Sequence, residues 1–178
     1  MWEIRIRLQL KNHVRDLALF DLAIDSKLRG CDLVKLKVRD VTRGANISKR
    51  AIVLQQKTQR PVQFEITKQT REALLSWIQK EELSYDGYLF RSRADKSNHL
   101  TTRQYARIVK SWVADIGLNP ASYGTHSLRR TKATQIYKRT KNIRAVQLLL
   151  AHTKLESTVR YLGIEVDDAL EIAERTEV

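Results

Sequence analysis

The sequence predicts an α+β fold that is mainly α-helical and contains one small antiparallel β-sheet. Over much of the chain the apolar residues recur every three or four positions, which is the period of a helix with one buried face. The stretch from residue 49 to 66 instead alternates apolar and polar residues, which is the period of a half-buried strand. With 178 residues, 42% of them apolar, the chain can build one compact core.

The first third of the chain is predicted to contain two helices and a strand. Residues 13–24, HVRDLALFDLAI, form a mostly buried helix in this interpretation. Residues 26–36 contain a turn followed by a short helix, with Leu33 and Leu36 facing inward. A short strand is expected over residues 38–41.

A β-hairpin is predicted next. The apolar members of its two runs are Ile52 and Leu54, then Val62, Phe64 and Ile66. Because Gln59, Arg60 and Pro61 separate the runs, the chain is expected to reverse there, with Lys57 near the turn.

The rest of the chain is predicted to be helical apart from a polar loop at residues 84–101. Thr67 caps a helix whose buried face carries Ala73, Leu74, Trp77 and Ile78. The helix after Thr101 has an unbroken apolar stripe and ends at Gly117. Its members are Tyr105, Ile108, Val109, Trp112, Val113 and Ile116. Further helices are expected after Thr125 as N-cap, over 142–152, over 156–162 and, as an acidic C-terminal helix, around 166–175.

Charge is the strongest indication of a partner. The net charge is +13, and it is unevenly distributed: residues 1–160 carry +18 and residues 161–178 carry −5. The high positive charge of residues 1–160 indicates a polyanionic binding partner, usually nucleic acid. The less favoured alternative is that the charge only confers solubility. No apolar run exceeds four residues, so no membrane span is expected. Cys31 is the single cysteine; we expect it to be buried, and the protein to be cytoplasmic.

A candidate anion site lies in the stretch GTHSLRRTKATQIY. His126 and Arg129 are three residues apart, so both would lie on one face of the first helical turn, near unpaired N–H groups. The histidines are not spaced as metal ligands, and there is no glycine-rich phosphate loop. Ser127 lacks the context of a hydrolase nucleophile. These patterns argue against a metal site, a nucleotide hydrolase and a serine hydrolase.

Four stretches together resemble the tyrosine recombinase (phage integrase) family. They are LFDLAIDSKLRGCDLVKL, QQKTQRPV, HSLRRTKAT and LLLAHTKLESTVRYL, which occur in the family's order and span nearly the whole chain. The resemblance implies that family's catalytic-domain fold. It also assigns a set of catalytic positions: Arg29, Lys57, His126, Arg129, His152 and Tyr161, with Asp32 supporting the first arginine.

The resemblance implies metal-free cleavage and rejoining of DNA without a cofactor. Tyr161 would be the nucleophile that forms a 3′-phosphotyrosine, and His126 would accept its proton. Lys57 would protonate the leaving 5′-oxygen, while His152 would hydrogen-bond the phosphate. Nine residues of continuous helix would place His152 and Tyr161 on opposite faces, so the helix is expected to break between them.

The predicted organisation is a catalytic domain over residues 1–163 and an acidic helical tail over 164–178. Members of the family usually carry a separate DNA-clasping domain in front, and that domain is expected to be absent from this chain. The implied partners are double-stranded DNA and further copies of the chain. We expect a free monomer, a tetramer on paired sites, and association with the nucleoid when bound to DNA. A type IB topoisomerase and a binding-only relative are the alternative functions.

Overall fold

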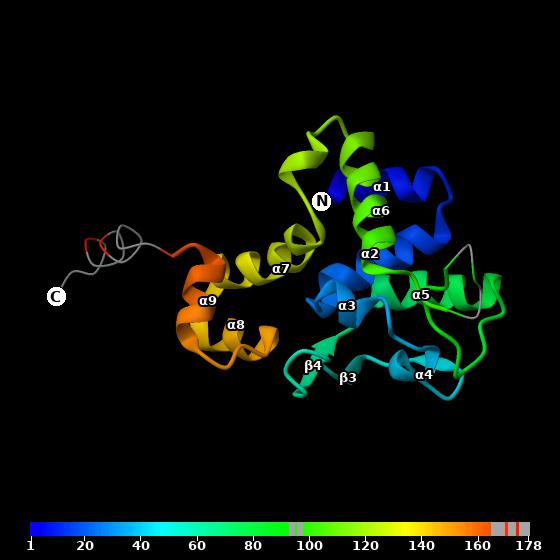
Figure 1. Cartoon of the computed structure of the whole chain (residues 1–178), viewed down its shortest axis with the longest axis horizontal. Coiled ribbons are helices and arrows are strands. Elements are labelled where there is room, and N and C mark those ends of the chain that lie inside the picture. The colour runs from blue at the N-terminus through cyan, green and yellow to red at the C-terminus, as the bar shows by residue number, and fades with distance from the viewer. Residues whose placement is uncertain (93–94, 96–97, 165–169, 171–173, 175–178) are drawn as a thin grey trace.

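The computed structural model describes residues 1–92, 95, 98–164, 170 and 174, and it is mainly helical (Figure 1). Its α-helices are α1 (Trp2–Leu10), α2 (Val14–Ser26), α3 (Gly30–Leu33), α4 (Val38–Val41), α5 (Lys68–Lys80), α6 (Thr102–Asp115), α7 (Thr125–Thr140), α8 (Ile143–Leu150) and α9 (Leu155–Leu162), with a 3-10 turn η1 (Pro120–Ser122). The predicted fold class is thus confirmed. The expected acidic helix around 166–175 falls mostly outside the described residues.

Two antiparallel hairpins supply the β structure, where the sequence predicted one. Strands β1 (Thr42–Arg43) and β2 (Asn46–Ile47) form the small hairpin. Strands β3 (Arg50–Leu54) and β4 (Pro61–Glu65) form the predicted one, with Arg50 opposite Glu65 and Leu54 opposite Pro61. Lys57 lies in its connecting turn, as expected.

In a half-buried strand the alternating Ile52 and Leu54 would face the core, but they lie on the exposed face of β3. Ile52 and Leu54 are 64% and 59% exposed, whereas Ala51 is buried and Val53 is partly buried against the core. Both faces of this strand carry apolar residues in sequence, so alternation alone does not identify the buried one.

The prediction of a strand at residues 38–41 was wrong, because this segment is the single helical turn α4. The Asp40 carboxylate accepts the Lys37 N–H at 2.8 Å and so caps the turn. Val38 and Val41, three residues apart, are both buried. That spacing places both side chains on one face of a helix, but on opposite faces of a strand.

Helix α1 has no counterpart among the predicted elements. Its apolar residues alternate with polar ones, so the sequence shows no helical stripe. Ile4 and Leu8, one turn apart, nevertheless pack into the core, whereas Trp2 and Leu10 are largely exposed.

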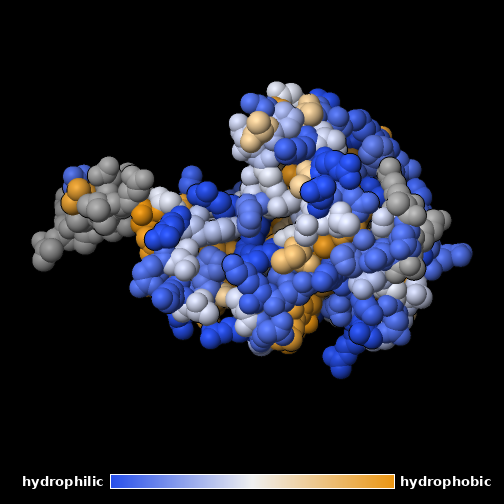
Figure 2. Space-filling model, in the orientation of Figure 1, coloured by the Kyte–Doolittle hydropathy of each residue, from blue (hydrophilic) through white to orange (hydrophobic). Residues whose placement is uncertain are grey.

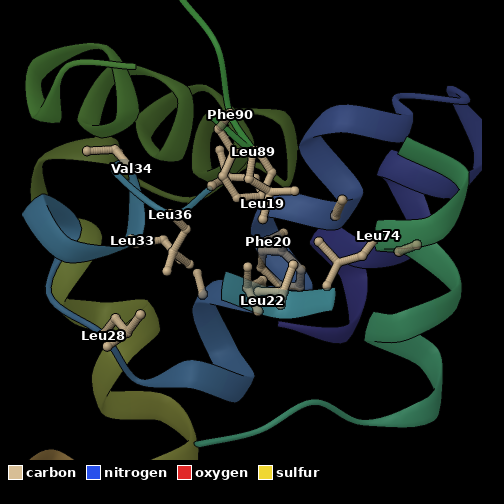
Figure 3. Packing of buried hydrophobic residues seen from close by; sticks show 14 of the residues in the cluster. Leu19, Phe20, Leu22, Leu28, Leu33, Val34, Leu36, Leu74, Leu89 and Phe90 are labelled. Atoms are coloured by element: carbon tan, nitrogen blue, oxygen red, sulfur yellow. The ribbon is translucent and has the colours of Figure 1, made fainter. Parts of the chain in front are cut away.

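The large hydrophobic core surrounds α2. Figure 3 shows Leu19, Phe20 and Leu22 of this helix among leucines and Phe90 from other segments of the chain. Phe20 makes an edge-to-face contact with Trp112 of α6, with ring centroids 5.7 Å apart. The buried faces predicted for α5 and α6 are confirmed, since Leu74, Trp77 and Val109 all lie in this core.

A second, smaller core joins the C-terminal half of α7 to α8 and α9. Its fully buried members are Ala133, Val146, Leu150 and Leu162. Helix α7 runs from the large core to this small lobe (Figure 1). Most of the face shown in Figure 2 is hydrophilic, with small hydrophobic areas.

Four charged side chains, Asp25, Lys27, Glu65 and Lys132, form a cluster between the end of α2, strand β4 and α7. Lys132 of α7 contacts Asp25 at 2.5 Å and Glu65 of β4 at 2.6 Å. The side chain of Lys27 has no exposed surface and pairs with Glu65 at 3.0 Å. Since Asp25 also accepts the Thr67 N–H at the start of α5, this charged cluster holds α2, α5, α7 and the hairpin together.

Candidate active site

Arg29 precedes α3 and is held by the hairpin. Its Nη1 donates to the Gln55 side-chain oxygen at 2.6 Å, and Thr58 Oγ1 donates to the same oxygen at 2.9 Å. Gln55 is only 1% exposed at the end of β3. The sequence interpretation missed Gln55; the signal was a polar residue directly after a strand and two positions before Lys57.

Asp32 lies one turn further along, in α3, and is buried. One carboxylate oxygen accepts the backbone N–H of Gln56 in the hairpin turn at 3.0 Å. Its other oxygen is buried and has no hydrogen-bond partner among the described residues. The predicted supporting residue therefore connects α3 to the hairpin beside Arg29. Cys31, expected to be buried, is instead half-exposed between them.

Helix α7 begins one residue earlier than a Thr125 N-cap implies, because Gly124 is the N-cap. The Ser127 hydroxyl accepts the Gly124 N–H at 3.1 Å, and Thr125 is the first helical residue. His126 and Arg129 share a helix face as predicted, but they differ in exposure. His126 is exposed at the helix start, whereas Arg129 is 3% exposed.

Arg129 is held between the two lobes. Its Nη2 donates to the Leu150 carbonyl at the end of α8, at 3.1 Å. Its Nε is buried without a partner in the described part of the chain. Burial lowers the Arg129 pKa, the nearby phenol of Tyr161 raises it and the charge of Arg29 lowers it further. An arginine remains a cation at neutral pH, so Arg29 and Arg129 place two positive charges near Tyr161.

The break predicted between His152 and Tyr161 is confirmed. Helix α8 ends at Leu150, two residues before the predicted end, and Ala151 adopts a left-handed conformation with φ of 51°. Helix α9 starts at Leu155 and brings Tyr161 back onto His152. Their rings meet edge to face, with centroids 5.4 Å apart and planes at 83°.

The environment changes the proton affinity of both rings. Burial, together with the charges of Arg129 and Arg29, lowers the pKa of His152 to about 4, so this imidazole is neutral at pH 7. Burial raises the pKa of the Tyr161 phenol, against the opposing charges of Arg129 and Arg130. Both guanidinium carbons lie 5.8 Å from the centre of the Tyr161 ring.

The Tyr161 oxygen is buried, and no described residue hydrogen-bonds to it. The charge of Arg129 acts on this oxygen and opposes the effect of burial on its pKa. The Tyr161 oxygen and the Arg129 Nε–H are thus both buried without a hydrogen-bond partner in the described structure. An incoming anionic group can accept a hydrogen bond from this Nε–H.

The structure thus gathers five of the seven predicted positions around one space: Arg29, Asp32, Arg129, His152 and Tyr161. Lys57 and His126 are exposed, and their side chains make no hydrogen bond or ion pair with the described residues. Helix α3 and the start of α7 are close together, because a Cβ on Gly30 would lie 3.8 Å from Thr125 Oγ1. The described residues include no group of three or more His, Cys, Asp or Glu placed to hold a metal ion. Among the same residues no helix has the length and apolarity needed to cross a membrane.

Comparison with known sequences identifies relatives along most of the chain. A model of the Phage integrase family matches residues 5–166. The probable integrase/recombinase YoeC of Bacillus subtilis is 31% identical over 166 residues, which cover 89% of this chain and 82% of that protein. Tyrosine recombinase XerC of Neisseria gonorrhoeae is 30% identical over 155 residues, 86% of this chain. The match covers 48% of XerC, so the chain spans about half the length of that relative.

Solved structures share the fold. The crystal structure of XerA recombinase superposes with a TM-score of 0.78 and 19% identity, covering 99% of this chain and 62% of that one. The pre-cleavage complex of the XerH site-specific recombinase gives a TM-score of 0.73 at 20% identity, covering 93% of this chain and 47% of XerH. The fold and the match to the family model lead to one conclusion: the chain belongs to the phage integrase family of tyrosine recombinases.

Proposed function

We propose that this chain is the catalytic domain of a site-specific DNA recombinase or integrase that cuts and rejoins strands through a 3′-phosphotyrosine. The observation that carries the proposal is the burial of the Tyr161 hydroxyl beside Arg129, with Arg29 and His152 bordering the same space. XerH is described as bound to its difH substrate, and a transposon integrase with the same fold as bound to transposon-end DNA. These descriptions support DNA as the substrate class.

In the proposed step, the Tyr161 oxygen bonds to the scissile phosphorus and the bond from phosphorus to the 5′-oxygen breaks. The phenol proton passes to a base, and the departing 5′-oxygen takes up another proton. The phosphodiester energy is retained in the phosphotyrosine, so the reverse attack by a 5′-hydroxyl rejoins strands without a cofactor.

Two arginines would stabilise the additional negative charge of the pentacovalent transition state. Arg29 and Arg129 suit this task because guanidinium groups are permanently charged and bind phosphate oxygens in pairs. Arg129 has a buried Nε–H without a partner in the described structure, and this donor would serve a phosphate oxygen. Loss of one such donor typically costs about 10²–10³ in rate.

Two exposed residues, His126 and Lys57, would transfer the protons. A phenol is protonated at neutral pH, and burial raises the pKa of Tyr161 further, so a base is needed, and we assign His126. Lys57 would protonate the 5′-oxygen from the hairpin turn. The neutral His152 would donate a hydrogen bond to the phosphate rather than a proton.

Covalent trapping tests this proposal. Because the target sequence is unknown, the substrate is a pool of nicked duplexes of randomised sequence, in which the released fragment diffuses away after cleavage. We expect a protease-sensitive protein–DNA adduct, which Tyr161→Phe abolishes. Tyr137→Phe is the matched control, since Tyr137 packs against the same small core. An adduct at full yield in Tyr161→Phe would contradict the assigned nucleophile.

We also propose that the chain is a monomer when free and assembles as a tetramer on paired DNA sites. The charge distribution supports this, because residues 1–160 carry +18 and residues 161–178 carry −5. The basic body would bind phosphates with little sequence preference and a steep dependence on salt. The acidic tail would contact the basic surface of a neighbouring copy.

A further inference from the structure

We propose that Thr158 is a positioning residue for the candidate site: its hydroxyl donates a hydrogen bond to Nδ1 of His152 and so places the ring proton on Nε2, facing the phosphate. The two atoms lie 3.1 Å apart. The catalytic consequence rests on the proposed function, whereas the position of the ring proton does not.

The direction of this hydrogen bond follows from the needs of a buried hydroxyl. Thr158 is fully buried, so its O–H needs an acceptor within the protein. The hydroxyls of Thr131 and Thr140 in α7 donate to the carbonyl four residues earlier, each at 2.8 Å. Thr158 makes no such bond, and Nδ1 of His152 is the one hydrogen-bond partner of its hydroxyl within the described structure. The Thr158 hydroxyl is therefore the donor.

The protonation of the imidazole follows from that direction. A neutral imidazole carries one proton, and the ring nitrogen that accepts a hydrogen bond does not hold it. His152 is neutral at pH 7 because burial lowers its pKa to about 4. With Nδ1 accepting from Thr158, the proton is on Nε2. No described residue hydrogen-bonds to Nε2, so this N–H is available to a phosphate oxygen.

Thr158 also connects the ring to the nucleophile helix. It lies three residues before Tyr161 in α9, so the two side chains share a helix face. One hydroxyl thereby fixes the ring that packs edge to face on Tyr161. The loop backbone has a separate support, because the Gln147 side chain donates to the carbonyls of His152 and Thr153, at 3.2 and 3.4 Å. Loss of the Thr158 hydroxyl should therefore release the imidazole without unfolding the loop.

The first test reads the ring proton directly. Long-range ¹H–¹⁵N NMR of the full chain at pH 7 identifies which nitrogen of each histidine is protonated, and His152→Gln assigns the His152 signals. We expect an unprotonated Nδ1 and a protonated Nε2. Thr158→Val, which keeps the side-chain volume, should mix the two tautomers, and Thr158→Ser should restore the first. Thr131→Val, which removes a helical hydroxyl elsewhere, should leave the His152 signals unchanged.

The second test measures two quantities for each variant: the single-turnover rate of adduct formation on the nicked duplex, and the affinity for DNA. Partners that orient metal-binding histidines contribute about 10–100-fold, and by analogy Thr158→Val should slow cleavage by that order at unchanged affinity, with rescue by Thr158→Ser. A protonated Nδ1 in the unmodified protein, or a Thr158→Val spectrum identical to it, overturns the proposal. The NMR result is independent of activity, so a chain that never cleaves DNA would refute the proposed function and leave this inference standing.

Discussion

Removing the Lys132 ammonium should destabilise the protein far more than removing an exposed lysine. Lys132 contacts Asp25 at 2.5 Å and Glu65 at 2.6 Å, and its side chain is 21% exposed. In Lys132→Met the hydrophobic stem is retained, but the two carboxylates lose their shared cation. The Asp25 side chain is only 6% exposed, so water cannot replace the lost partner.

The size of the effect follows from this burial. Breaking a buried ion pair from one side typically costs about 3–5 kcal/mol. The Glu65 side chain is 36% exposed and still has Lys27, so we expect the lower end, about 3 kcal/mol. For a urea m-value of about 2 kcal/mol/M, the unfolding midpoint should fall by about 1.5 M.

Urea unfolding followed by tryptophan fluorescence measures this shift, because Trp77 and Trp112 are buried in the large core. Lys68→Met is the matched control: Lys68 is 84% exposed and lies 3.9 Å from Glu72, so its loss should cost at most about 1 kcal/mol. Adding Asp25→Asn to Lys132→Met removes the uncompensated buried charge and should recover part of the loss. Equal midpoints for Lys132→Met and Lys68→Met would refute the reasoning.

Four further predictions concern pH (two of them), the first arginine and metal ions. The pKa values of Asp25 and Glu65 are lowered despite the opposing effect of burial, by hydrogen bonds and lysine charges, so the stability they contribute should be lost as the pH falls below about 4 in acid unfolding. Burial raises the pKa of Asp21 to about 6 in spite of the Arg5 charge, so stability should instead decrease as the pH rises from about 4 to 6, and Asp21→Asn should remove that slope. Arg29→Lys should slow covalent trapping by about 10²-fold or more, because an ammonium cannot bind two phosphate oxygens as a guanidinium does; an unchanged rate would show that Arg29 does not contact the phosphate. Adduct formation should persist in excess chelator, and its complete loss with recovery on one divalent ion would contradict the metal-free step.

The elements with regular periodicity could be predicted from the sequence. Helix α6, with its stripe from Tyr105 to Ile116, and the hairpin around Lys57 are where the pattern places them. Helix α1 could not be predicted, since Trp2 to Leu10 alternate like a strand and only contact with α2 and α6 selects the helix. Local pattern carries no information about such tertiary contacts.

The candidate site likewise contains residues that the sequence could identify and residues that it could not. The resemblance to the family identified the positions that the structure brings together, including Arg29 and Tyr161. It missed Gln55 and Thr158, because the role of a polar residue that supports another through one hydrogen bond depends on which residue the fold brings beside it. Gln55 meets Arg29 across 26 positions of sequence, and only the folded chain shows that contact.

The unequal size of the two cores implies that Tyr161 belongs to a separate cooperative unit of unfolding. The small core has four fully buried hydrophobic residues within the described structure, and cooperative units with few buried contacts open at lower free energy than the whole domain. Tyr161 lies at the edge of that unit, whereas Arg29 belongs to the segment packed on the large core. In hydrogen exchange, the amides of α8 and α9 should therefore exchange through sub-global opening while those of α2 await global unfolding. Tyr161 can therefore move away from Arg29 and Arg129 at less than the free energy of global unfolding, while Arg29 stays packed on the large core.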